Sequence, residues 1–158
     1  MKNKLAFLMS FLLMISTNTY AAVISQCSNP SGTAYYPYLG LMAKKDSGWV
    51  DDKITGGITS LVKTDDNEYD ILFVDITKQI ISSKQDGGKV YTLSKGKNDA
   101  SFLVVYPGKA VEIYTFLIDK SGKAEYIQVT SRAGDEILIA KSTVMRGDCT
   151  FINLDLIK

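Results

Sequence analysis

Any acid–base chemistry in this chain would have to come from carboxylates. The 158-residue sequence contains no histidine, which removes the usual imidazole general base and the nucleophile triads built on it. A glycan hydrolase needs only two acids that face each other across a cleft at roughly 5–9.5 Å. The candidate acids are Asp51, Asp52, Asp70, Asp75 and Glu112. Asp70 and Glu112 lie beside apolar stretches, where partial burial would raise the pKa of a carboxyl. Nothing in the spacing pairs these acids, so we predict no catalytic residue.

Metal and cofactor sites have little support in the sequence. Without histidine, and with only two cysteines, zinc, copper and iron sites lack their commonest ligands. The pairs Gly56-Gly57 and Gly87-Gly88 lack the lysine and the helix start of a phosphate-binding loop. They fit turn or bulge positions instead. We therefore predict no metal, no cofactor and no enzymatic activity.

Aromatic side chains are the clearest candidates for a binding surface. Tyr35, Tyr36 and Tyr38 cluster around a proline, and Trp49, the single tryptophan, follows in a glycine-containing segment. Tyrosine and tryptophan are enriched at the energetic centres of protein interfaces. These four residues are the predicted binding residues. The alternative is that they pack over one end of the domain.

The first 21 residues have the pattern of a cleavable secretory signal. Lys2 and Lys4 precede the apolar run Leu5–Ile15, which is too short for the roughly 20 residues of a transmembrane helix. A polar stretch then leads to Ala21, after which we expect cleavage. The mature chain would be one domain, residues 22–158, periplasmic or secreted and without a membrane anchor. Charges of both signs are interspersed along it, which disfavours nucleic acid as a partner.

The two cysteines, Cys27 and Cys149, lie near the two ends of this mature chain. An exported protein meets an oxidising compartment, so we expect them to form a disulfide. Such a bond would close nearly the whole domain into one loop.

Short β-branched and aromatic stretches, separated by turn residues, predict an all-β fold. Asp86-Gly87 is typical of a tight hairpin, and Pro107-Gly108 of successive turn positions. The expected strands cover residues 58–64, 69–76, 80–83, 89–93, 101–106, 111–118, 123–131, 136–145 and 149–157. Hairpin after hairpin predicts a single antiparallel meander of about nine strands, either a barrel or a two-sheet sandwich, with a slight preference for the barrel.

Four further local predictions follow from the pattern. Residues 35–41 should be an edge strand or a loop, and residues 44–52 a short helical turn or a long loop. Arg146-Gly147-Asp148 should be a turn between the last two strands. In the strand 123–131, Ile127 and Val129 share one face and Gln128 and Thr130 the other, so one face should meet the core and the other water.

The segment Ser31-Gly32-Thr33-Ala34-Tyr35 has the form Ser-Gly-x-x-Tyr. This form resembles the short loop motif of some bacterial periplasmic lysozyme inhibitors, which are also small, β-rich exported proteins. The resemblance covers five residues and lies near the N-terminus, whereas the motif of that family lies in a mid-domain loop. It implies a protein-binding role.

Together these features predict an exported, non-enzymatic binding module whose partner is another protein, in an inhibitor or immunity-type role. One alternative is a carrier that holds a small apolar ligand inside a barrel. Another is a histidine-free glycan hydrolase with a carboxylate pair. The sequence does not separate the first two, because both need only a well-packed β shell.

Overall fold

The computed structural model describes residues 20–74 and 77–158. The predicted signal therefore lies almost entirely outside the described residues, as does Asp75. Ten strands and two short 3-10 helices make up the described chain. They are β1 (Tyr20–Tyr36), η1 (Lys44–Asp46), β2 (Gly48–Lys53), β3 (Ile58–Thr64), β4 (Tyr69–Val74), β5 (Ile80–Ser82), β6 (Lys89–Lys95), β7 (Asp99–Tyr106), β8 (Ala110–Ile118), β9 (Ala124–Arg132), β10 (Lys141–Ile152) and η2 (Leu154–Leu156).

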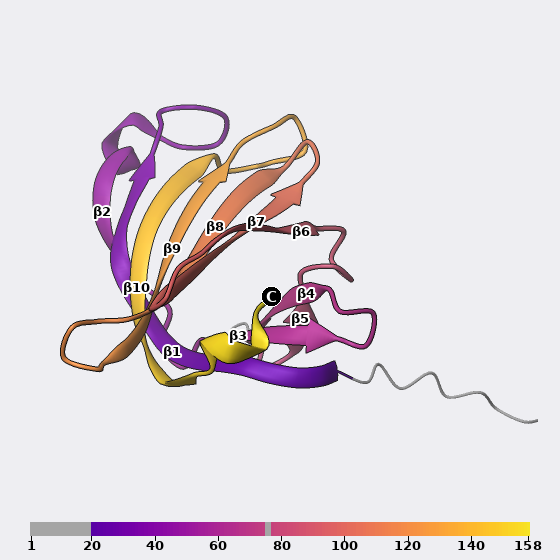
Figure 1. Cartoon of the computed structure of the whole chain (residues 1–158). Helices are drawn as coiled ribbons and strands as arrows, with labels where there is room; N and C mark the ends of the chain where they lie inside the picture. The colour runs from indigo at the N-terminus through magenta and orange to yellow at the C-terminus, as the bar shows by residue number, and fades with distance from the viewer. Residues whose placement is uncertain (1–19, 75–76) are drawn as a thin grey trace, which may run out of the picture.

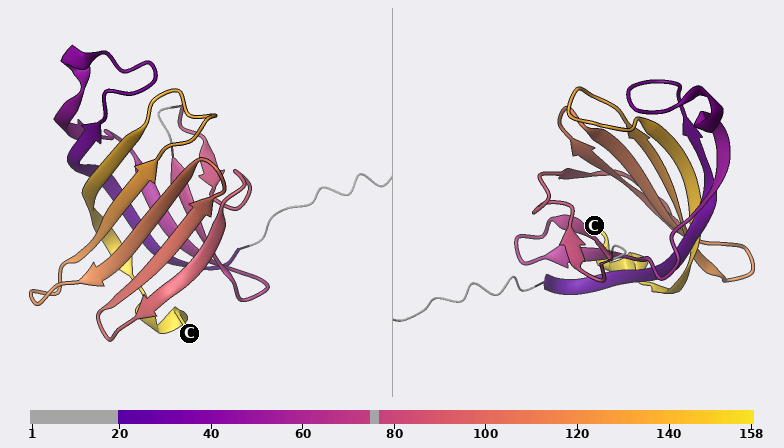
Figure 2. Two further views of the ribbon diagram at one scale, coloured as in Figure 1. Left: turned by 90° about the horizontal axis from the view of Figure 1, so that it is seen from above. Right: turned by 180° about the vertical axis from the view of Figure 1, so that it is seen from behind.

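All the strands belong to one antiparallel sheet, with the order β5-β4-β3-β1-β10-β9-β8-β7-β6 and β2 paired with β1 beside this path. The predicted all-β antiparallel meander of about nine strands is confirmed, because β3 to β5 and β6 to β10 each pair with the next strand along the chain, and β1 pairs with β10, β3 and β2. The sheet curls until its two edge strands, β5 and β6, approach each other (Figure 1). No ladder joins these two edges. A short turn connects them, in which the Gly88 amide donates to the Ser83 carbonyl at 2.7 Å. The fold is thus a barrel left open on one side, and not a two-sheet sandwich (Figure 2).

The longest unpredicted element is β1, whose 17 residues pair along one side with β10 and along the other with β3 and then β2. Pro30 interrupts it, since proline lacks an amide donor, and the register with β10 shifts between Ser28 and Ser31. At the same level lies the link between β2 and β3, in which the Ile54 amide donates to the Pro30 carbonyl at 2.9 Å. Strands β2 and β3 therefore act as one interrupted strand against β1. The segment 44–52, expected to be a helical turn or a loop, contains both η1 and most of β2.

The predicted turn Arg146-Gly147-Asp148 is wrong, because these residues lie inside β10. Gly147 pairs with Tyr126 of β9. A Cβ atom at position 147 would lie 2.4 Å from Cε1 of Tyr126 and 2.7 Å from the Ser28 carbonyl oxygen. The glycine lets the tyrosine ring cross the strand, and so has a packing role rather than a turn role. The two expected strands 136–145 and 149–157 are accordingly one strand, preceded by a loop and followed by η2.

Cys27 and Cys149 form the predicted disulfide, with an S–S distance of 2.05 Å. They are direct cross-strand partners in the β1–β10 register, and the Cys27 side chain is fully buried. The bond closes a loop across a sequence separation of 122 residues. It therefore joins covalently the two strands at the middle of the sheet order.

The core fills the end of the barrel below the open mouth, around a row of aromatic rings. Tyr69 lies 5.1 Å from Phe102, Phe102 lies 6.3 Å from Phe116, and Phe116 stacks on Tyr126 at 6.0 Å between centroids. The C-terminal segment crosses this end of the barrel (Figure 1), and Leu154 and Ile157 add their side chains to the same core. Within the residues that the structure describes, no helix is long and apolar enough to span a membrane.

Candidate functional site

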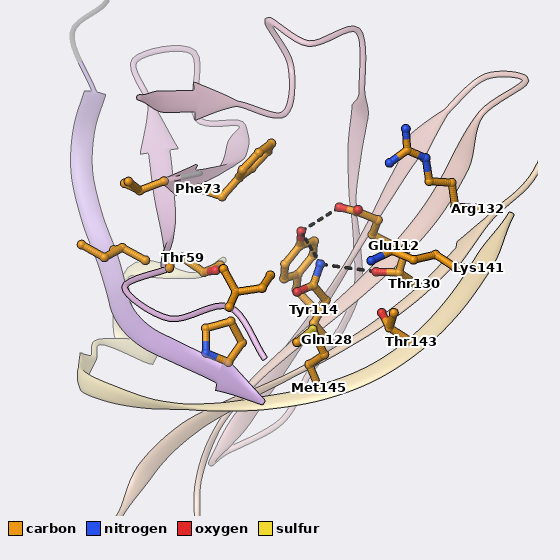
Figure 3. A pocket seen from close by; sticks show the side chains of 15 residues that line it. Thr59, Phe73, Glu112, Tyr114, Gln128, Thr130, Arg132, Lys141, Thr143 and Met145 are labelled. Carbon is orange, nitrogen blue, oxygen red and sulfur yellow. Dashed lines mark hydrogen bonds between the residues drawn. The ribbon is translucent and has the colours of Figure 1, made fainter. Parts of the chain in front are cut away.

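A cavity of about 330 Å³ lies inside the curled sheet, above the aromatic core. One wall comes from β1, β3, β4 and the link between β2 and β3, and the other from β8, β9 and β10 (Figure 3). The lining residues are Pro30, Ile54, Gly57, Ile58, Thr59, Phe73, Val74, Glu112, Tyr114, Gln128, Thr130, Arg132, Lys141, Thr143 and Met145. The two walls differ in chemistry, as the next paragraphs describe.

The wall formed by β8, β9 and β10 is polar, and the register of the three strands arranges its side chains in rows. Alternate residues of a strand point to the same face, so neighbouring strands in register place their inward side chains side by side. From the end near the loop 133–140 inward, the rows are Arg132 with Lys141, then Glu112 with Thr130 and Thr143, then Tyr114 with Gln128 and Met145. The wall therefore changes from charged at the mouth to less polar next to the aromatic core.

Hydrogen bonds connect the second and third rows. The Tyr114 hydroxyl donates to a Glu112 carboxylate oxygen at 2.7 Å, and Gln128 Nε2 donates to the Tyr114 oxygen at 3.0 Å (Figure 3). Gln128 Nε2 also lies 3.3 Å from Thr130 Oγ1. The network links four cavity side chains and so fixes their orientation before any ligand binds, which favours selective polar recognition.

Burial raises the pKa of the Glu112 carboxyl, while the hydrogen bond from Tyr114 and the positive charges of Arg132 and Lys141 act to lower it. Partial burial with a raised pKa was expected of one of the two acids Asp70 and Glu112, and Glu112 has both properties. Burial likewise raises the pKa of the Tyr114 hydroxyl well above its ordinary value, with the charge of Glu112 adding to the shift. The phenol thus remains a hydrogen-bond donor at neutral pH.

The opposite wall is mainly apolar. Ile58 on β3 and Phe73 and Val74 on β4 face the cavity, together with Pro30 and Ile54. Its polar lining side chain is Thr59, whose hydroxyl lies 3.1 Å from the hydroxyl of Tyr126 in the core. A molecule between the two walls would meet carbon on one side and hydrogen-bonding groups on the other.

The alternating pattern in β9 has the predicted period, but its polar face is the inner one. Thr130 is only 6% exposed, whereas Val129 is 40% exposed on the outer surface. Gln128 shares the inner face with Thr130 and lines the cavity. The usual assignment of apolar residues to the core is thus reversed along this part of the barrel.

Arg132 and Lys141 lie directly opposite each other on β9 and β10 at the mouth of the cavity. Lys141 Nζ lies 3.6 Å from Asp52 Oδ2. The Arg132 guanidinium has no ion pair or hydrogen bond with any described residue. Both side chains also line a second, more open hollow of about 390 Å³, formed with Tyr36, Glu136, Leu138 and Ile139. The two cations therefore stand where the inner cavity meets the outer hollow.

The predicted aromatic residues are divided among three places. Tyr35 and Trp49 are cross-strand partners on β1 and β2, with ring centroids 5.2 Å apart and with 40% and 69% of their surfaces exposed. Tyr36 points to the other face, into the second hollow. Tyr38 lies in the following loop and is 68% exposed. The structure thus brings Tyr35 and Trp49 together as an exposed pair and separates them from Tyr36.

The candidate acids are likewise dispersed. Asp70 is buried and accepts hydrogen bonds from the Ser82 hydroxyl at 2.5 Å and from the Lys84 amide at 3.2 Å, so its contacts support the β4–β5 hairpin. Asp51 is exposed on β2, and Asp52 pairs with Lys141. Glu112 is the one carboxylate among the described residues that line the inner cavity. Among the residues that the structure describes, the walls therefore hold no second acid of the kind that a glycan hydrolase needs.

Sequence reasoning missed most of the cavity, including Tyr114, Gln128, Arg132 and Lys141. The signal that could have found them is a run of polar residues at alternate positions in three consecutive strands. The Ser-Gly-x-x-Tyr segment, by contrast, lies within β1, paired with both β10 and β2, and forms no loop. Neither a family model, nor a curated protein, nor a solved structure matches this chain.

Proposed function

We propose that this protein is an exported, non-enzymatic carrier or sensor that binds a small amphipathic molecule inside its open barrel. The observation that carries the proposal is the two-sided cavity, with an apolar wall facing a hydrogen-bonded polar wall. Antiparallel barrels of this size commonly enclose one small ligand. The expectation of a wholly apolar ligand is modified here, because an apolar molecule would leave the polar wall without partners.

The dimensions and construction of the cavity support this proposal. Its volume lies near the lower end of the usual range for small-molecule sites, about 300–1,000 Å³. Its polar groups stand on strands rather than on mobile loops, and they are held by one another. The disulfide between β1 and β10 fixes the strand pair that joins the two walls. Export to an oxidising compartment, predicted from the first 21 residues, fits such a bond.

The test is native mass spectrometry of protein purified from the compartment to which it is exported. Extra mass of a few hundred daltons, lost on denaturation, is the expected result. Thr143→Phe should fill the cavity and abolish the extra mass. Ser142→Phe is the matched control, because Ser142 is the exposed neighbour on the same strand and faces outward. Ligand retained by Thr143→Phe, or no ligand on any preparation and no binding of added amphiphiles, would refute the proposal.

A second candidate function is binding of another protein through the exposed aromatic pair Tyr35 and Trp49. The specific observation is that both rings are solvent-exposed and packed against each other on the β1–β2 hairpin. Rigid exposed aromatic rings supply contact area at low entropic cost. Trp49→Ala should then abolish capture of a periplasmic or extracellular protein by the immobilised chain while changing the melting temperature little. Unchanged capture by this variant would remove the candidate.

A further inference from the structure

The mouth of the cavity has an unbalanced charge arrangement. Like charges directly opposite each other on neighbouring strands destabilise a sheet, and Arg132 and Lys141 are such a pair, with both side chains on the inner face. Asp52 is the counter-ion of Lys141. Arg132 makes no ion pair with any described residue, although its positive charge acts to lower the pKa of Glu112. The Arg132 residue is exposed at the mouth, so its guanidinium stays hydrated and remains accessible to an anion from solution.

We infer that the ligand is an amphipathic anion whose acidic head group binds Arg132 at the mouth and whose apolar body lies against Phe73 and Met145. This inference rests on the proposed function, since it assumes that the inner cavity is the binding site. Guanidinium groups bind carboxylate and phosphate through paired N–H···O bonds. Arg132 lies where the inner cavity opens into the second hollow, so a head group there would keep access to water while the body enters the barrel.

The neighbouring groups favour a ligand with an anionic head group over one with a cationic head group. Glu112 is the other charged group on the polar wall, and a ligand cation would need to reach it past Arg132 and Lys141. The carboxylate already accepts a hydrogen bond from Tyr114. Its partial burial also favours the neutral form, which would repel an anionic head group less. The rows of the wall thus place positive charge outermost and the less polar side chains deepest, as an amphipathic anion requires.

Four probes with the same chain and different head groups test the inference: octanoate, octyl phosphate, octanol and octylammonium. Their dissociation constants would be measured by isothermal titration calorimetry with the full mature protein. We expect one of the two anions to bind at least about tenfold more tightly than octanol, the increment of one charge-assisted hydrogen bond. The ranking of octanoate against octyl phosphate identifies the head group as carboxylate or phosphate.

Two variants make the test specific. Arg132→Gln should bring the affinity for the preferred anion down to that for octanol and leave octanol binding unchanged. Arg146→Gln is the control, because Arg146 is an exposed arginine on β10 that pairs with Glu125 and Asp148 away from the cavity. Anions that bind no better than octanol, or octylammonium as the tightest probe, would overturn the head-group inference and leave the proposed function standing. Failure of all four probes to bind would contradict both.

Discussion

The hydroxyl of Tyr114 donates a 2.7 Å hydrogen bond to the carboxylate of Glu112, two residues earlier on the same inward face of β8. The same hydroxyl accepts a hydrogen bond from Gln128 on the neighbouring strand. Tyr114 is therefore the shared member of the polar network, and it is itself fully inside the barrel.

Replacing Tyr114 with phenylalanine should lower the free energy of unfolding by about 1–3 kcal/mol, because it leaves Glu112 and Gln128 without their common partner. Urea unfolding followed by fluorescence measures the change. The removal of this donor should also raise the pKa of Glu112 further, since the hydrogen bond acts to lower it. Tyr91→Phe, at an exposed position on β6, is the control and should be close to neutral. Equal stability of Tyr114→Phe and Tyr91→Phe would show that the network contributes nothing.

The raised pKa of Glu112 predicts a pH-dependent difference between the wild type and Glu112→Gln. The folded protein holds this proton more tightly than the unfolded chain, whose carboxyl titrates near the ordinary value of 4.5. Below that value Glu112 is protonated in both the folded and the unfolded state, so its ionisation no longer contributes to the difference in stability between the two proteins. As the pH rises from about 4 to 7, ionisation of Glu112 should lower the stability of the wild type relative to Glu112→Gln.

Urea unfolding of both proteins across this pH range checks the sign. The groups that act on Glu112 are Tyr114, Arg132, Asp86 and Lys141, so their charges belong in the interpretation. Asp51→Asn, which removes an exposed carboxylate on β2, controls for the overall change in charge. A wild type whose free energy of unfolding rises relative to that of Glu112→Gln as the pH increases would contradict the raised pKa.

Loss of the disulfide should cost the protein a large part of its stability. For a closed loop of about 120 residues, the chain-entropy argument gives about 4–5 kcal/mol, with measured values for native disulfides commonly 2–5 kcal/mol. The free energy of unfolding of the double variant Cys27→Ala with Cys149→Ala should therefore be lower by this amount, and its urea midpoint should fall accordingly. Reductant should bring the wild type to the same midpoint and leave the double variant unaffected. Insensitivity of the wild type to reductant would contradict the prediction.

Gly147→Ala should destabilise the protein by about 1–3 kcal/mol or more, since the added methyl group would overlap the ring of Tyr126 and the Ser28 carbonyl. Thr150→Ala, at an exposed site later on β10, provides the comparison. Thermal unfolding of the two variants measures the difference. Equal melting temperatures of the two variants would show that the Tyr126 ring can pack beside position 147 without a glycine there.

The hairpins were predictable from the sequence because their information is local. Asp65–Asn67, Gly87 and Gly122 each turn the chain, and Asn67 and both glycines have positive φ values that suit such turns. The β1 strand was not predictable in the same way. Its pairing with β10 joins the two ends of the domain, and Pro30 within it looks like a break.

The binding site was harder to predict than the fold, for a related reason. Gln128 and Thr130 look like solvent-facing residues in a half-buried strand, and only closure of the sheet turns their face inward. Arg132 and Lys141 are 9 positions apart in the chain and meet only through the β9–β10 register. By contrast, the pairing of Cys27 with Cys149 was predicted because the sequence contains two cysteines and its first 21 residues predict export to an oxidising compartment.

The absence of a ladder between β5 and β6 has a mechanical consequence. Widening the barrel at that side breaks no strand-to-strand hydrogen bonds and only extends the turn between Ser83 and Gly88. The β1–β10 pair, near the middle of the sheet order, is covalently locked by Cys27 and Cys149. The two walls of the cavity are thus joined covalently near the middle of the sheet, whereas the two edges are held by the Ser83–Gly88 turn and by the packing of Tyr69 on Phe102. Movement at the open side would therefore change the width of the interior and leave the register of its polar rows unchanged.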